Sequence, residues 1–168
     1  MSKLAFLLTR VQLETGNLDT LIKAAAAAAG VTLLYCVVDL PTSETKYREA
    51  IAQAIRDGAD SIMVADSPET LTNSAMIADL ISAVRLPAIY PFPEFVDAGG
   101  LMAYSFDLAE LIRRAAGDID AVLRGANPGD IPFYQASKFE LSINLKTAKA
   151  LRLAVPPALL ASADKVIE

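Results

Sequence analysis

The run Val-Thr-Leu-Leu-Tyr-Cys-Val-Val at residues 31–38 is the clearest structural signal in the chain. It is continuously apolar, β-branched and aromatic, which is typical of a strand buried on both faces of a parallel sheet. Asp39 follows it and begins a short break that ends the strand. The single cysteine, Cys36, lies inside the run, so we expect a buried and inert thiol.

Strand-like and helix-like segments alternate on both sides of this run. Before it, the sequence predicts a strand over 3–9 and a helix over 18–29 that ends at Gly30. After it, we expect a helix over 43–57 that begins at Ser43, and then a strand over 61–65. A second helix over 67–81 begins at the pair Ser67-Pro68, and another strand follows over 86–90. Three strand–helix units followed by a strand predict right-handed crossovers and a three-layer, Rossmann-like α/β fold with a parallel sheet.

The pattern changes beyond residue 90. The triplet Pro91-Phe92-Pro93 argues against a helix at that point. Asp107 is a suitable cap for a long amphipathic helix that ends at Gly125. Before that helix we expect an extended run over 101–104. After it we expect a linker-like stretch over 126–132, a half-buried strand over 138–145 and two short helices over 146–151 and 158–163.

The composition excludes several function classes. Hydrophobic residues make up 54% of the 168 residues and charged residues 21%, as in a packed globular protein. The net charge of −5, without a Lys/Arg cluster, argues against nucleic acid or an anionic membrane as a partner. Because histidine is absent, His metal ligands and Ser-His or Cys-His catalysis are excluded, and we expect no metal and no cofactor. No apolar stretch is long enough to predict insertion into a membrane.

Candidate binding residues follow from the rule that ligands of open α/β sheets bind beyond the carboxyl ends of the strands. Thr9 and Arg10 come after the first strand, and Asp66 and Ser67 after the third. Asp66 and Ser67 stand at a helix start, where polar donors suit a ligand carboxylate, although simple capping is the commoner explanation. Arg10 could pair with an anionic ligand, and the alternative is a solvated loop arginine.

Three aromatic residues complete the candidate site. Tyr90, Phe92 and Tyr104 could form an aromatic wall around an apolar ligand, or they could pack in the core. The sequence has neither a Gly-x-Gly-x-x-Gly nor a Gly-x-x-x-x-Gly-Lys-Ser/Thr motif, so a dinucleotide or a nucleoside triphosphate is not indicated.

The second half of the chain resembles a known family. Its motifs, in order, are Phe-Val-Asp-Ala-Gly-Gly-Leu-Met-Ala-Tyr (95–104), Leu-Arg-Gly-Ala-Asn-Pro-Gly-Asp-Ile-Pro (123–132) and Lys-Phe-Glu-Leu-Ser-Ile-Asn-Leu-Lys-Thr-Ala-Lys-Ala-Leu (138–151). They resemble the C-terminal part of ABC transporter substrate-binding proteins of the tryptophan/tyrosine-transport type. The resemblance implies a type I periplasmic-binding-protein fold, in which two α/β lobes close on a solute and present it to a membrane permease.

The same resemblance suggests how the chain is divided. Residues 1–92 would form the second lobe, 93–125 a crossover strand and helix that pack on a first lobe, and 126–168 a linker, a return strand and C-terminal helices. We expect a homodimer, with exchange of residues 101–125 between copies as one way to form it. The family implies a periplasmic location, whereas the chain has no signal peptide and would be cytoplasmic if it were the full gene product.

The function expected is that of a solute-binding component of an ABC-type importer, or one lobe of it, and not of an enzyme. The ligand would be amino-acid-like, with aromatic amino acids as one option, and it would place its polar ends at Thr9, Asp66 or Ser67 and its apolar part at Tyr90 and Phe92. One alternative is a remnant that dimerises without binding a solute. Another is a flavodoxin-like cofactor domain, which the lack of a Gly/Ser/Thr-rich first loop disfavours.

Overall fold

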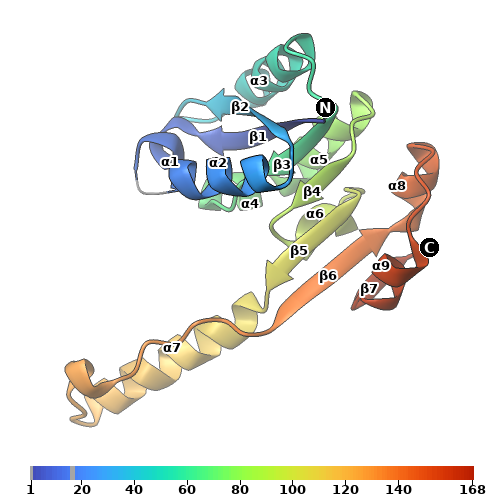
Figure 1. The fold of residues 1–168 in the computed structure, drawn as a ribbon. Helices are drawn as coiled ribbons and strands as arrows, with labels where there is room; N and C mark the ends of the chain where they lie inside the picture. Colours follow the sequence, from blue (N-terminus) through green and yellow to red (C-terminus); the bar gives the residue numbers. More distant parts are fainter. Residues whose placement is uncertain (1, 16–17) are drawn as a thin grey trace.

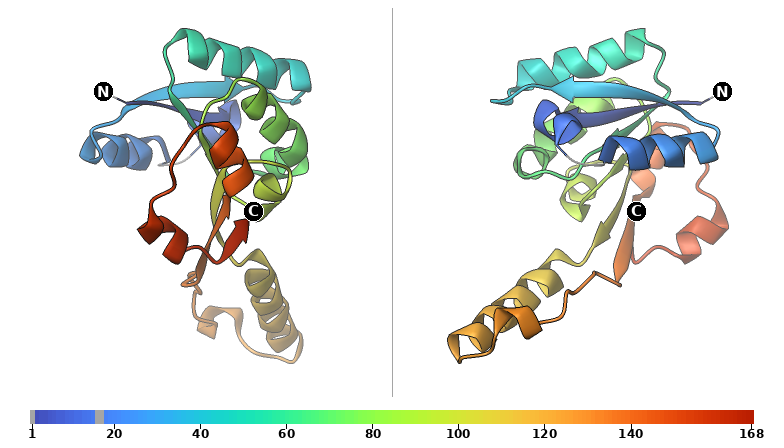
Figure 2. Two further views of the ribbon diagram at one scale, coloured as in Figure 1. Left: turned by 90° about the vertical axis from the view of Figure 1, so that its right-hand side faces the viewer. Right: turned by 60° about the vertical axis from the view of Figure 1, so that its left-hand side comes forward.

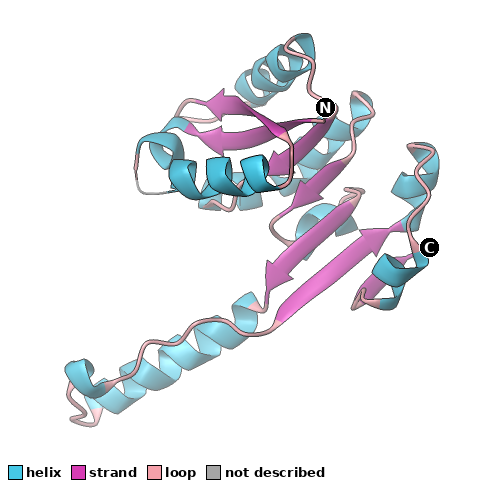
Figure 3. Ribbon diagram, viewed as in Figure 1, coloured by secondary structure: helices cyan, strands magenta, loops and turns pink. Residues whose placement is uncertain are grey.

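The computed structural model describes residues 2–15 and 18–168, whose strands form one seven-stranded sheet in the order β2-β1-β3-β4-β5-β6-β7 (Figure 1; Figure 3, magenta). The strands are β1 (Lys3–Thr9), β2 (Thr32–Val38), β3 (Ser61–Val64), β4 (Ala88–Tyr90), β5 (Met102–Phe106), β6 (Phe139–Asn144) and β7 (Lys165–Ile167). Neighbouring strands are parallel except β5 and β6, which are antiparallel. The predicted α/β class with a Rossmann-like parallel sheet is therefore confirmed, with one antiparallel pair added to it.

Helices cover both faces of the sheet, as a three-layer fold requires. They are α1 (Arg10–Glu14), α2 (Leu18–Ala28), α3 (Glu44–Arg56), α4 (Pro68–Thr72), α5 (Ser74–Ala83), α6 (Pro93–Asp97), α7 (Leu108–Leu123), η1 (Pro128–Asp130), α8 (Leu145–Ala150) and α9 (Pro157–Ala161). The larger core joins one sheet face to α3, α5 and α6, through residues such as Leu7, Tyr47 and Phe95. A smaller core around Phe6 and Leu8 lies on the opposite face.

The strand β2 differs from its prediction because it lies at the edge of the sheet. Cys36 and Val38 are buried, whereas residues 32–35 are only half-buried. An edge strand has a neighbour on one side, so a continuous apolar run does not by itself show burial on both faces. The expected burial of Cys36 is confirmed, and that burial raises the pKa of its thiol to about 12.

Local corrections concern helix boundaries. The helix expected over 67–81 is two helices, α4 and α5, which meet at Asn73. Pro93 begins α6 instead of preventing a helix, because the first helical position needs no N–H donor. The short elements α1 and β7 were not predicted, since segments of a few residues carry too little periodic pattern to be recognised.

The segment 101–125 is divided by the structure. Its strand, β5, lies inside the sheet between β4 and β6, and only its helix, α7, leaves the body of the molecule (Figures 1 and 2). No residue of α7 is buried, and the apolar side chains of Ile112 and Ile119 are each 61% exposed. A strand that is hydrogen-bonded on both sides cannot be exchanged without breaking the sheet, so α7 is the part of this segment that is free to contact another body.

The returning chain stays beside α7 on its way to β6 (Figure 1). The Tyr134 hydroxyl donates to a Glu110 carboxylate oxygen at 3.1 Å, and the Arg114 guanidinium lies 4.1 Å from the centre of the Tyr134 ring. These contacts attach the return segment to one side of the helix and leave much of its apolar stripe exposed. We call α7 with residues 124–138 the arm.

A tight turn before β5 requires glycine. A Cβ atom at Gly100 would lie 2.6 Å from a Tyr90 ring carbon and 2.7 Å from the Phe95 carbonyl oxygen. Both neighbours are held in place, because the Tyr90 and Phe95 rings stack at 4.8 Å and the Gly100 N–H donates to that carbonyl. The turn at Gly99-Gly100 therefore fixes the path from α6 into the sheet.

We expect Gly100→Ala to lower the free energy of unfolding by about 1–3 kcal/mol, the usual cost of overpacking a buried site. The control is Gly117→Ala on the exposed α7, where the added Cβ meets nothing within 4 Å. That change should raise stability by up to about 1 kcal/mol through helix propensity. Urea unfolding of both variants measures the difference, and equal midpoints would contradict this account of the turn.

Candidate functional site

The carboxyl ends of β1 and β3 are tied together by side chains. Thr9 caps α1: its hydroxyl accepts from the Gln12 N–H at 3.3 Å, and the Thr9 N–H donates to the Gln12 side-chain oxygen at 3.0 Å. The Gln12 side-chain amide then donates to the Asp66 carbonyl at 2.6 Å. Thr9 is buried, so its hydroxyl is committed to holding the edge together.

An exposed ion pair lies beside this connection. The Arg10 guanidinium donates to the Asp39 carboxylate at 2.5 Å, which joins the end of β1 to the end of β2. The Lys46 ammonium donates to the carbonyl oxygens of Asp39 and Pro41 at 3.1 and 2.7 Å. The hydrogen bond from Arg10 lowers the pKa of the Asp39 carboxyl below its ordinary value. Arg10 is therefore a paired cation at an open surface and not a solvated loop residue.

The two residues after β3 have different environments. Ser67 is buried, and its hydroxyl accepts from the Thr70 N–H at 3.1 Å in a capping box of α4. The Thr70 hydroxyl in turn donates to the Ala65 carbonyl at 2.8 Å. Asp66 is exposed, and its carboxylate forms no hydrogen bond or ion pair with another residue in the described part of the chain. Partial desolvation raises the pKa of Asp66 above its ordinary value.

The predicted aromatic wall does not form in this structure. Tyr90 and Phe92 are buried, Tyr90 against Phe95 and Phe92 edge-on to Phe106 at 6.1 Å. Tyr104 is 54% exposed and stacks on Phe139 at 5.4 Å. In the β4–β5 register Tyr90 lies opposite Ala103, so Tyr104, one residue further, points to the other face of the sheet.

Several residues at this edge were not among the predicted site residues. Gln12 and Asp39 supply the contacts that connect the strand ends, while Val11 and Leu40 expose about half of their apolar side chains close to Arg10 and Asp39 in sequence. The signal for them was positional, because each lies within about three residues of the end of β1 or β2. Their pairing could not be seen in the sequence, since Arg10 and Asp39 are 29 residues apart and Gln12 and Asp66 are 54 residues apart.

The edge can therefore offer a free carboxylate at Asp66, a guanidinium at Arg10 and small apolar surfaces. Within residues 2–15 and 18–168, no cluster of three or more His, Cys, Asp or Glu side chains is arranged to hold a metal ion. No helix in the same ranges is long and apolar enough to cross a bilayer.

Comparison with known protein families gives a match over most of the chain. Residues 16–167 match the sequence profile of a family described as ABC transporter substrate binding protein. Comparison with curated proteins gives no match.

Solved structures share the fold at low sequence identity. A conserved domain protein from Vibrio cholerae O1 biovar El Tor superposes with a TM-score of 0.85 at 21% identity, over 98% of this chain and 54% of its own. An ABC domain from Streptococcus pneumoniae in complex with L-Trp has a TM-score of 0.82 at 23% identity, over 99% and 56%. The ligand-free, open structure of a substrate-binding protein with adhesive properties from Clostridium difficile has a TM-score of 0.67 at 14% identity, over 99% and 54%. The chain thus spans about half the length of these proteins.

The pKa values of Asp39 and Asp66 should be shifted in opposite directions from the ordinary carboxyl value. The lowered pKa of Asp39 means that its contribution to stability is present above its unfolded pKa and is lost as the pH falls through the folded value. The pKa of Asp66 is raised in the folded protein, so its contribution to stability is present below its unfolded pKa. That contribution is lost as the pH rises through the pKa of the folded protein.

A titration of the carboxyl carbons by NMR should therefore give a higher midpoint for Asp66 than for Asp39. Arg10→Gln should raise the Asp39 midpoint and leave that of Asp66 in place. The reverse order of midpoints, or an Asp39 midpoint that does not respond to Arg10→Gln, would contradict the geometry of this edge.

Proposed function

The chain belongs to the ABC transporter substrate-binding protein family, and we propose that one edge of its sheet is half of the solute-binding cleft of an ABC-type importer. This edge, formed by the carboxyl ends of β1, β2 and β3 and the residues that follow them, is called the carboxyl edge. The observation that carries this proposal is the free Asp66 carboxylate, which lies at the end of β3 next to the strand end that bears Arg10. A carboxylate that has no partner in the described part of its chain is available for a cationic group of a ligand.

The ligand we propose is amino-acid-like. Asp66 would accept hydrogen bonds from the ligand α-ammonium group, which would also lower the raised pKa of this carboxyl. Arg10 would bind the ligand carboxylate, in competition with Asp39. Thr9 and Ser67 would act as positioning residues, because their hydroxyl groups are engaged in the caps of α1 and α4.

An aromatic side chain is the finer part of the proposal. It is supported by the L-Trp bound to the Streptococcus pneumoniae domain, which has the same fold. Since Tyr90 and Phe92 are buried in the core, the apolar contacts on this half would come from Val11 and Leu40, and the remaining contacts from a facing lobe. A ligand held on one side keeps much of its surface in water, so the single lobe should bind weakly.

The same membership supports a proposal about the cellular setting. We propose that the protein presents its solute to an ABC permease, works in the periplasm or at the outer face of the membrane, and catalyses no reaction. The paired Arg10–Asp39 contact and the Asp66 carboxylate fit electrostatic recognition of a solute.

Tryptophan binding can be measured directly, because the chain contains no Trp. Fluorescence anisotropy of added L-tryptophan should rise on binding, and Asp66→Asn should weaken the binding about tenfold, as expected for loss of a charge-assisted hydrogen bond. Asp79→Asn is the control, because Asp79 is exposed on α5, on a different part of the surface. An anisotropy that stays flat up to millimolar tryptophan would remove the aromatic ligand, and calorimetry with other amino acids would test the broader class.

We also propose that the exposed stripe of α7 is covered by another protein body. In a protein with a first lobe, that lobe would cover it, and in the chain studied alone a second copy would do so. The stripe includes Ile112, Ile119 and Leu123, and exposed apolar patches of this kind promote association. Because β5 remains in its own sheet, the dimer would form through the arm and not through exchange of the strand.

Light scattering at tens of micromolar should therefore show a dimer. Ile112→Glu should convert it to a monomer, because a carboxylate in an apolar contact must lose its hydration. Arg113→Glu introduces glutamate at the neighbouring, exposed position of the helix and should leave the dimer intact. A monodisperse monomer of the unmodified chain would overturn this part of the proposal.

A further inference from the structure

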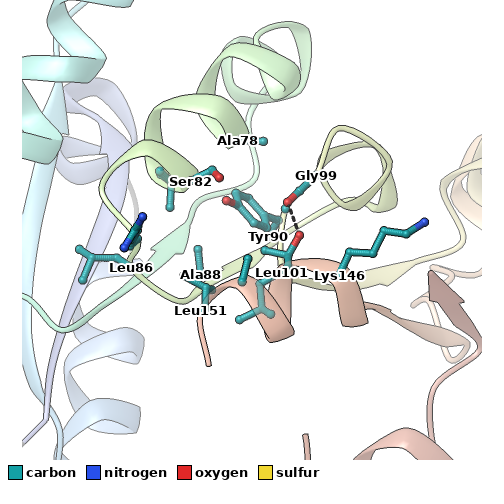
Figure 4. Close-up of a pocket in the computed structure, with 14 residues that line it drawn as sticks. Ala78, Ser82, Leu86, Ala88, Tyr90, Gly99, Leu101, Lys146 and Leu151 are labelled. Atoms are coloured by element: carbon teal, nitrogen blue, oxygen red, sulfur yellow. Dashed lines mark hydrogen bonds between the residues drawn. The ribbon is translucent and has the colours of Figure 1, made fainter. Parts of the chain in front are cut away.

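A cavity lies on the α5 side of the sheet, away from the carboxyl edge (Figure 4). Its volume is about 440 Å³, within the range of small-molecule sites. Its walls come from the end of α5, from β4, from the turn at Gly99-Gly100 and from α8. None of the edge residues Thr9, Arg10, Asp66 and Ser67 lines it, so it is separate from the proposed solute cleft.

Tyr90 places an unpartnered hydroxyl group at this cavity. The residue is only 3% exposed, and its hydroxyl forms no hydrogen bond with any other residue of the described chain. Its ring is held by stacking on Phe95 and by close packing over Gly100. In Figure 4 the hydroxyl points toward the side on which Ser82 lies. The hydroxyl oxygen itself is accessible from the cavity, so it is available to donate to a ligand oxygen.

The wall of the cavity that α8 forms is fixed in position by hydrogen bonds. The Thr147 hydroxyl of α8 donates to the Gly99 carbonyl at 2.8 Å, and the Thr147 N–H donates to the Asn144 side-chain oxygen at 3.1 Å. These bonds attach α8 to the turn before β5 and keep the cavity from closing by a shift of the helix.

The charge of the lining is opposite to that of the chain. Among the described residues, the lining contains Arg85 and Lys146 and no Asp or Glu, whereas the whole chain carries a net charge of −5. Arg85 follows α5 with φ of 55°, and neither cation forms an ion pair with another residue in the described ranges. In Figure 4 the Lys146 ammonium points away from Tyr90, so Arg85 is the cation to which we assign ligand contact.

The rest of the lining is mostly apolar, with Ile81, Leu86, Leu101 and Leu151 contributing the largest side chains. We propose that this cavity is a second ligand site, which binds a small carboxylate with an apolar body. The carboxylate would accept hydrogen bonds from the Tyr90 hydroxyl and the Arg85 guanidinium, while the body would lie against the leucine side chains. The proposal does not depend on the solute cleft.

Octanoate is a suitable probe, because it combines one carboxylate with a flexible apolar chain. In a two-dimensional ¹H–¹⁵N NMR titration of the 168-residue protein, it should shift the amide signals of Ser82, Leu101 and Thr147 in a saturable manner. The signals of Arg10 and Asp66 should stay in place, which separates this site from the solute cleft. The neutral 1-octanol should bind more weakly by about tenfold, the effect of losing charge-assisted hydrogen bonds.

Matched variants test the assigned contacts. Arg85→Gln should weaken octanoate binding about tenfold, whereas Arg152→Gln should change it less than about twofold. The two arginines form a matched pair, because Arg152 also has a positive φ, 59°, just after a helix, but it does not line this cavity. Tyr90→Phe should weaken binding by a smaller factor without reducing stability, since the stacked ring is kept.

Three results would overturn the proposal. They are the absence of saturable shifts at the lining residues, equal effects of Arg85→Gln and Arg152→Gln, and equal affinities for octanoate and 1-octanol. Loss of tryptophan binding at the carboxyl edge would not affect it, so the two sites can fail independently.

Discussion

The pairing of β5 on both sides is the constraint on which the rest of the molecule depends. β5 is parallel to β4 and antiparallel to β6, with Met102 opposite both Ile89 and Ile143. Because β6 runs backwards, α8 begins at the end of the sheet opposite to the carboxyl edge. The same pairing requires the chain to leave the sheet after Phe106 and to return before Phe139, and the arm is the result. The pairing of β5 therefore determines that the carboxyl edge, the arm and the cavity beside α8 lie in different parts of the molecule.

Alternation along short strands then decides the fate of each aromatic residue. Tyr90 and Tyr104 belong to adjacent strands, yet the register sends them to opposite faces of the sheet. Tyr90 becomes part of the larger core and a wall of the cavity, while Tyr104 forms an exposed stack with Phe139. An aromatic residue near the end of a strand is therefore a binding residue only if its face of the sheet is also the face of the site.

Polar groups at the carboxyl edge show a similar division of roles. Thr9 and Ser67 each accept from one N–H group in the first turn of α1 and α4, that of Gln12 and that of Thr70, which otherwise would lack a partner. Arg10 and Asp39 pair across neighbouring strand ends, and Asp66 is left with a free carboxylate and a raised pKa. The residues that build the edge and those available to a ligand are adjacent in sequence but differ in their hydrogen bonds.

Much of this protein could be predicted from the sequence by itself. The apolar runs at 3–9 and 31–38, the capping residues Ser43, Ser67 and Asp107 and the ordered motifs beyond residue 95 determined the α/β class, most elements and the family, because these depend on local periodicity and capping. Only the tertiary structure decided that β2 is an edge strand, that β5 stays in the sheet, that Arg10 pairs with Asp39 and that Tyr90 lines a cavity. Each of these depends on contacts between segments far apart in the chain, and local pattern carries no information about which distant segments meet.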